Sequence, residues 1–227
     1  MASLDVAKAF DSVTHPTLKQ TMTIRGFPQL MIDYVMSSYK NSTTRFSFDG
    51  RLSDIVRPTC GVKQGDHLSL ILFNLVMDRM IRGLSPDIGV NVGGNKFNGL
   101  LFADDLLLFA STPKGLQLSL DHVHSYLKNC GLLINNNKSF TLSIKAFAKQ
   151  KKTAVTTSGA FMCGRHKLPS ISRQDTFSYL GIPFTPEGKS FSRPNLQFSK
   201  AISKITKAPL KPSLLLGLSS CLVFTIC

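Results

Sequence analysis

Two adjacent aspartates, Asp104 and Asp105, stand in the middle of an apolar stretch, NGLLFADDLLLFA over residues 98–110. Two apolar runs meet at the pair without a spacer, which predicts a strand, a tight turn and a second strand. The flanks LLF and LLLF are continuous rather than alternating, so burial on both faces is expected. Two carboxylates this close repel each other, and a divalent cation would offset that repulsion. From this feature alone, a metal site and an ordinary surface turn both stay open.

Asp5 is a further carboxylate candidate, at the end of a short strand predicted over residues 2–6. Its context is LDVAKAFDSV, in which Asp11 fits a helix N-cap or a turn residue. On its own, Asp5 carries little information about chemistry.

The elements that must position these carboxylates follow from apolar periodicity and turn residues. Helical spacing covers residues 15–26, 28–40, 68–84 and 114–130, and 194–207 is a further candidate helix. Asp49-Gly50 between short strands predicts a hairpin, residues 131–138 a loop, and residues 140–184 short strands and turns. Helices interleaved with antiparallel hairpins predict an α+β fold with helices on one face of a small antiparallel sheet.

The composition is that of a globular chain, with 43% apolar and 18% charged residues. Lys and Arg number 27 against 13 Asp and Glu, for a formal net charge of +14. A basic soluble protein would show this balance, but it favours a polyanion partner, with nucleic acid ahead of a membrane. The apolar C-terminal segment, residues 214–227, is shorter than the roughly 20 residues that span a bilayer. It is interpreted as a helix without its packing partner, in preference to a membrane anchor.

Five ordered motifs resemble the reverse transcriptases of non-long-terminal-repeat retrotransposons. They are LDVAKAFDSV, GVKQGDHLSLILFNLVMD, FADDLLLFA, GLLINNNKS and YLGI. The similarity is closest to elements that insert site-specifically into ribosomal RNA genes, and it runs from Leu4 to about Pro212. A lone FADD would be a weak signal, whereas five motifs in order are specific.

The resemblance implies a polymerase palm and assigns the acidic residues to it. Asp5 and Asp104 would bind two Mg²⁺ ions, or Mn²⁺, with Asp105 assisting, for transfer of deoxynucleotides to a primer 3′-hydroxyl. Lys138 would approach the triphosphate and protonate the leaving pyrophosphate. A solvated loop lysine is the alternative for Lys138.

The resemblance also assigns residues to the nucleotide and the primer. The backbone from Val6 to Phe10 would cradle the triphosphate, with Phe10 as a steric gate against a 2′-hydroxyl or, alternatively, an ordinary core aromatic. The remaining assignments are Gln64 and Gly65 in the incoming-nucleotide pocket, and a primer grip formed by Tyr179, Leu180 and Gly181, for which a plain buried turn is the alternative.

The implied partners are an RNA template, a DNA primer and deoxynucleoside triphosphates. No membrane partner is expected, and the nucleus is the expected location. Residues 1–190 are predicted to be the palm without its N-terminal fingers, and residues 191–227 a partial thumb. His67 and Leu70 stand where the family usually has proline, which presets the turn into the following helix. These departures predict weak activity at best for the isolated chain. The alternative is a catalytically silent nucleic-acid-binding remnant of the same domain.

Overall fold

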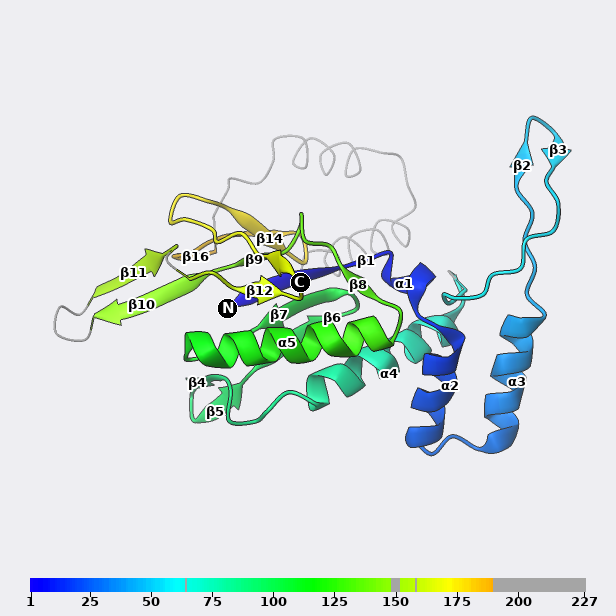
Figure 1. Cartoon of the computed structure of the whole chain (residues 1–227), viewed down its shortest axis with the longest axis horizontal. Coiled ribbons are helices and arrows are strands. Elements are labelled where there is room, and N and C mark those ends of the chain that lie inside the picture. The colour runs from blue at the N-terminus through cyan, green and yellow to red at the C-terminus, as the bar shows by residue number, and fades with distance from the viewer. Residues whose placement is uncertain (64, 148–151, 158, 190–227) are drawn as a thin grey trace, which may run out of the picture. The chain divides into compact units, whose positions relative to one another are not determined.

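The structure is a computed structural model that describes residues 1–63, 65–147, 152–157 and 159–189 (Figure 1). It divides into two units, Met1–Asp175 and Thr176–Cys227. Gln64, the candidate helix 194–207 and the predicted thumb remnant 191–227 lie outside the described residues. Among the described helices, none combines the length and hydropathy needed to cross a membrane.

The first unit is built on a five-stranded antiparallel sheet in which β1 is central. The order is β6-β7-β1-β8, and β9 also pairs with β1. The strands are β1 (Ala2–Ala7), β6 (Gly99–Phe102), β7 (Asp105–Leu108), β8 (Leu133–Ile134) and β9 (Phe140–Thr141). Buried and partly exposed residues alternate along β1, so only one of its faces packs into the core.

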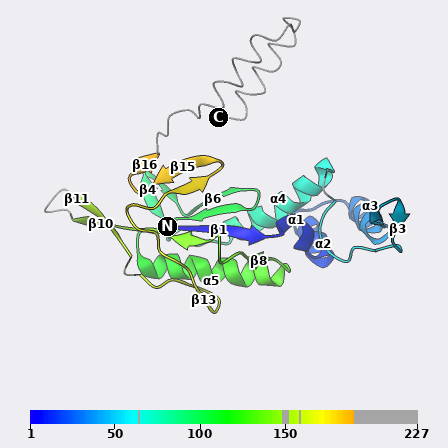
Figure 2. The ribbon, with the colours of Figure 1, turned by 90° about the horizontal axis from the view of Figure 1, so that it is seen from above.

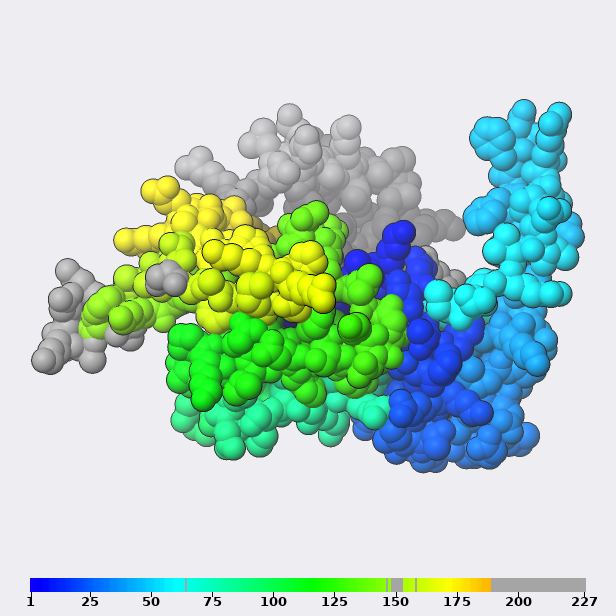
Figure 3. All heavy atoms as spheres, viewed as in Figure 1, coloured from blue at the N-terminus to red at the C-terminus, as the bar shows by residue number. Residues whose placement is uncertain are grey.

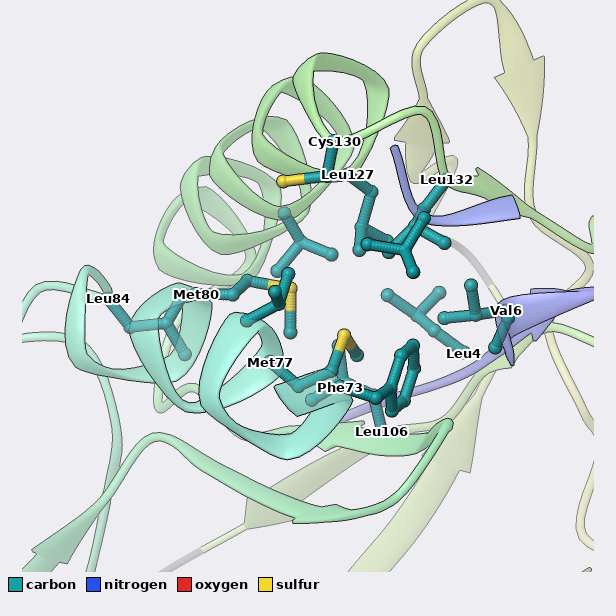
Figure 4. Close-up of a cluster of buried hydrophobic side chains, with 14 of the residues drawn as sticks. Leu4, Val6, Phe73, Met77, Met80, Leu84, Leu106, Leu127, Cys130 and Leu132 are labelled. Atoms are coloured by element: carbon teal, nitrogen blue, oxygen red, sulfur yellow. The ribbon is translucent and has the colours of Figure 1, made fainter. Parts of the chain in front are cut away.

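The helices supply the apolar cover of that face. They are α1 (Ala9–Ser12), α2 (His15–Ile24), α3 (Gln29–Lys40), α4 (His67–Arg82) and α5 (Pro113–Asn129). Figure 4 shows α4 and α5 placing Phe73, Met77 and Leu127 against Leu4 and Leu106 of the sheet. Figure 2, a view turned by 90°, shows α5 running along the sheet. The predicted α+β architecture, with helices on one face of a small antiparallel sheet, is confirmed.

The helix starts follow from capping residues that are readable in the sequence. Asp66 is the N-cap of α4, where its Oδ1 accepts the Leu68 N–H at 3.0 Å. Thr112 caps α5 by accepting the Gly115 N–H at 3.1 Å. These caps satisfy backbone donors that the first helical turn leaves free. Asp11, expected at a cap or a turn, lies inside α1, and Lys8 is the N-cap.

Short hairpins complete the described chain. In the first unit they are β2–β3 (Ser47–Phe48, Arg51–Leu52), β4–β5 (Val90–Val92, Asn95–Phe97), β10–β11 (Ser143–Phe147, Lys152–Thr156) and β12–β13 (Met162–Cys163, His166–Lys167). The second unit contains β14 (Phe177–Tyr179), β15 (Ile182–Thr185) and β16 (Gly188–Lys189). Asp49 and Gly50 have φ of 49° and 74°, as a type I′ turn requires, which confirms the hairpin predicted there. The predicted loop 131–138 is wrong in one respect, because β8 within it pairs with β1.

Candidate active site

The acidic hairpin is formed by β6 and β7 and turns at Ala103 and Asp104. Phe102 pairs with Asp105, so the turn contains only two residues. Ala103 has φ of 53°, a left-handed conformation that a residue with a Cβ atom rarely adopts. Backbone strain of this kind is concentrated at functional sites. The turn leaves Asp104 at the tip of the hairpin and Asp105 as the first residue of β7.

Asp5 and Asp105 lie directly opposite each other, on the adjacent strands β1 and β7. The Asp5 N–H donates a hydrogen bond to Ser139 Oγ, and the Asp5 C=O accepts one from the Asn135 N–H. Both groups therefore point toward β8 and away from β7. The Asp5–Asp105 pair therefore has no backbone bonds of its own, the geometry in which opposed Cα atoms approach to about 4.5 Å. The next pair along, Leu4 and Leu106, is buried, so the two aspartates lie on the sheet face away from the helices.

The two strands of the acidic hairpin differ in burial. Leu106, Leu107 and Leu108 of β7 are all buried, as the continuous apolar run predicts. In β6, Leu100 and Phe102 are 46% and 63% exposed. The prediction of burial on both faces is thus right for β7 and wrong for β6, because β6 is the edge strand and nothing described covers its outer face.

A buried hydroxyl and the chain after β8 hold the backbone of Asp5. The Asn135 N–H donates to the Asp5 carbonyl at 2.8 Å, and the Asp5 N–H donates to Ser139 Oγ at 3.1 Å. Ser139 Oγ in turn donates to the Asn135 carbonyl at 2.8 Å, and Ser139 is only 1% exposed. Sequence reasoning missed Asn135 and Ser139. Both lie in the motif GLLINNNKS, in which the resemblance assigns a role only to Lys138.

A recess of about 480 Å³ opens beside these residues. Its charged lining residues are Asp5, Lys8, Asp11, Asp104 and Lys138, and the others are Val6, Ala7, Ala9, Phe10 and Asn135. The Lys138 N–H donates to the Asn135 carbonyl at 3.1 Å, a turn that carries the lysine to the recess. The structure therefore brings together five of the predicted site residues, Asp5, Val6, Phe10, Asp104 and Lys138.

The carboxylates of Asp5, Asp104 and Asp105 lie close enough to change the pKa of Asp105. Burial raises the pKa of Asp105, the charges of Asp104 and Asp5 raise it further, and Lys138 opposes them. The donor set fits a divalent cation, since Mg²⁺ is usually held by one or two carboxylates together with substrate phosphates. Within the described part of the chain, no three His, Cys, Asp or Glu side chains are gathered closely enough to hold a metal ion by themselves.

A second recess, of about 470 Å³, is also bordered by Phe10. Its lining consists of Phe10, Lys63, Gly65, Asp66, His67, Ser69 and Leu70. The Phe10 ring lies 4.5 Å from the Phe73 ring, centroid to centroid, so it packs on the core while bordering both recesses. Gly65, predicted in the nucleotide pocket, lies in this recess. The two residues that replace proline, His67 and Leu70, line it as well.

The predicted primer grip belongs to the second unit. Tyr179 pairs with Ile182, and the turn between them has left-handed φ of 51° at Leu180 and 76° at Gly181. Leu180 is 46% exposed, and the primer grip stays a prediction.

Comparison with known proteins identifies the family of the chain. The model of the family "Reverse transcriptase (RNA-dependent DNA polymerase)" matches residues 1–184. The chain is 45% identical over 212 residues to the retrovirus-related Pol polyprotein of the type-2 retrotransposable element R2DM of Drosophila melanogaster. A type-1 element R2 polyprotein of Nasonia vitripennis is 37% identical over 212 residues. Each alignment covers 93% of this chain and 20% of the polyprotein, so the chain spans about a fifth of these relatives.

Solved structures agree at the level of the fold. A telomerase from Candida Tropicalis, in complex with a fragment of telomeric RNA, superposes with a TM-score of 0.53 at 14% identity. That superposition covers 91% of this chain and 32% of the telomerase chain.

Proposed function

Since this chain belongs to the reverse transcriptase (RNA-dependent DNA polymerase) family, we propose that it is the palm of an RNA-directed DNA polymerase. The proposed reaction transfers a deoxynucleotide to the 3′-hydroxyl of a DNA primer paired with an RNA template. The observation that carries it is the placement of three aspartates, Asp5, Asp104 and Asp105, at one end of a pair of adjacent strands. The R2 retrotransposable elements among the chain's relatives support retrotransposition as the proposed setting. The nucleus is the proposed location, which follows only from that setting.

Asp5 and Asp104 are the proposed ligands of two Mg²⁺ ions, because both line the same recess. When bound, such ions stabilise the charge on the attacking and leaving oxygens of an in-line phosphoryl transfer. Asp105 lies beside them, and its pKa is raised first by burial and then by the charges of Asp104 and Asp5, of which a bound cation would offset the second. Mn²⁺ prefers the same oxygen ligands and is expected to substitute.

The remaining residues of the two recesses suit a nucleotide that lies across Phe10. Lys138 shares the acidic recess with Asp104, where its ammonium group can bind phosphate and supply a proton to the leaving pyrophosphate. Phe10 lines both recesses, and its ring is the proposed steric gate against a 2′-hydroxyl. The backbone from Val6 to Phe10, which includes Lys8 at φ 46°, is the proposed cradle of the triphosphate.

Primer extension tests the proposal. The 227-residue chain is incubated with an RNA template, a labelled DNA primer, Mg²⁺ and deoxynucleotides, alongside Asp104→Asn. Extension by the parent chain that disappears in Asp104→Asn supports the proposal. Extension that survives in Asp104→Asn refutes the assigned site. Since phosphoryl transfer depends on positioning and charge stabilisation, and the chain spans a fifth of its relatives, weak extension is expected.

A second candidate function is nucleic-acid binding without catalysis, favoured by the net charge of +14. A silent binding domain would bind RNA with an affinity that falls steeply with salt, because phosphate contacts release counterions. Salt-sensitive binding with no metal-dependent incorporation would select this candidate over the polymerase.

A further inference from the structure

A hairpin arm, residues 44–57, is exposed along its whole length. It follows α3 and contains β2 and β3 (Figures 1 and 3, cyan). Every residue of the arm is exposed, including large apolar side chains: Phe48 at 85%, Phe46 at 68% and Leu52 at 63%. Clustered apolar exposure of this kind marks an interaction site.

Backbone pairing gives the arm a defined shape in spite of its exposure. Thr44 and Val56 exchange two N–H···O bonds of 2.9 Å at the base. Further out, the Ser53 N–H donates to the Phe46 carbonyl at 2.9 Å, and the Phe46 N–H donates to Ser53 Oγ at 3.0 Å. Phe48 pairs with Arg51 next to the type I′ turn. One extra residue lies between Ser53 and the Thr44–Val56 bridge, but from Phe46 to Ser53 the pairing keeps one register, so side chains in this outer part alternate between two faces.

That alternation places Phe46 and Phe48 on the same side. Residues two apart in a strand share a face at a spacing of about 6.8 Å. Arg51, opposite Phe48, lies on this face too, because paired residues in an antiparallel ladder project to the same side. We call this set, Phe46, Phe48 and Arg51, the aromatic face. Two exposed rings and a guanidinium group in a row suit flat, unpaired bases joined by phosphates.

The excess of positive charge around the arm also suits a single-stranded nucleic acid. Between residues 40 and 63 the chain has five cations and two carboxylates, namely Lys40, Arg45, Arg51, Arg57 and Lys63 against Asp49 and Asp54. A purely apolar protein partner would gain nothing from this excess, whereas a polyanion would.

The arm is also continuous with the second recess, which Lys63 and Phe10 line. The chain leaving its base is tied to the palm by two bonds of 2.7 Å, from the Gly61 N–H to the Val13 carbonyl and from the Val62 N–H to the Phe10 carbonyl. Lys63 and Phe10 then line the same recess. A strand lying along the arm is therefore led toward the place where the incoming nucleotide would pair.

From this arrangement we infer that the arm binds single-stranded RNA, by stacking unpaired bases on Phe46 and Phe48 while Arg51 contacts a phosphate. The inference deepens the proposed polymerase function and rests on it for the identity of the strand as template. It requires neither metal nor catalysis, so it can fail or succeed independently of nucleotide transfer.

Fluorescence anisotropy with a labelled 12-nucleotide RNA, in EDTA, tests the inference on the full 227-residue chain. Phe48→Ala is expected to weaken binding by about five- to a hundredfold, the cost of losing one stacked base. Phe48→Trp is expected to retain binding. Arg51→Ala is expected to lower the slope of log affinity against log salt by about 1.

Two matched comparisons distinguish base stacking from phosphate binding and from non-specific binding by exposed apolar side chains. An abasic oligomer of the same length keeps the phosphates, so Phe48→Ala should leave its binding unchanged. Leu30→Ala removes a comparably exposed apolar side chain, 83%, from α3 and should not affect either probe. Equal binding of the RNA by Phe48→Ala and the parent chain would overturn the inference. A dimer in sedimentation velocity that Phe48→Ala dissociates would overturn it in favour of a protein interface.

Discussion

Ser139 gives the most direct test of how the site is held together. Its hydroxyl accepts the Asp5 N–H at 3.1 Å and donates to the Asn135 carbonyl at 2.8 Å. Ser139→Ala removes both bonds at a position that is 1% exposed. Water has little access there, so the Asp5 N–H is left without a partner on that side.

The size of the effect follows from that orphaned donor. A buried polar group left unsatisfied costs about 1–3 kcal/mol, and removal of a hydroxyl creates too little space to add much to this. We therefore expect Ser139→Ala to lower the free energy of unfolding by about 1–3 kcal/mol. Because the lost bond is to the backbone of Asp5, the carboxylate of that residue should also become less well placed.

The assay compares Ser139→Ala with Ser119→Ala by urea denaturation. Ser119 is also 1% exposed, but its Oγ is buried without a hydrogen-bond partner among the described residues. Replacement of Ser119 by alanine should therefore be neutral or slightly stabilising, since it removes an unsatisfied group. Mn²⁺ titration under conditions where both variants are fully folded then reports on the site. Weaker Mn²⁺ binding is expected for Ser139→Ala, with Asp104→Asn as the reference for a damaged site.

Two results would refute the reasoning. Equal stability of Ser139→Ala and Ser119→Ala would show that the Ser139 bonds contribute nothing. Unchanged Mn²⁺ affinity in a destabilised Ser139→Ala would show that the residue stabilises the fold without positioning Asp5.

The N-terminal amine and Gly61 give two further predictions. Burial lowers the pKa of the Met1 amine from 8.0 to about 6. Between these two pH values the unfolded chain binds more protons than the folded chain. The free energy of unfolding should therefore rise as the pH rises from about 6 to 8. N-terminal acetylation keeps a donor for the Leu142 carbonyl, 2.7 Å away, without a charge, and should raise stability by up to about 2 kcal/mol at pH 6 and by little at pH 8. An acetylated chain whose advantage does not depend on pH would contradict this. Gly61 has φ of 85°, and a Cβ there would lie 2.8 Å from the Asp11 carbonyl oxygen. Gly61→Ala should therefore cost about 1–3 kcal/mol in thermal or urea unfolding, whereas Gly50→Ala, with a similar φ of 74° and open space around it, should cost less.

Local features of the sequence were sufficient for most of the elements. The two apolar runs that meet at Asp104 and Asp105 leave room only for a tight turn, and the structure has one. Asp66 and Thr112 mark helix starts because their side chains reach backbone donors two or three residues away. Asp49-Gly50 specifies its hairpin because both residues tolerate left-handed φ. Each of these is an interaction within a few residues, which periodicity and composition record.

The assembly of the site was decided by tertiary structure. Asp5 lies opposite Asp105 through strand pairing across 100 positions of sequence, and Ser139 reaches Asp5 across 134. The same sheet turned part of a predicted loop into β8 and left β6 at an exposed edge. From the sequence alone, the aspartates could be named but only a family resemblance could join them. Strand register and buried polar contacts depend on which distant segments share a core, and no local pattern encodes that.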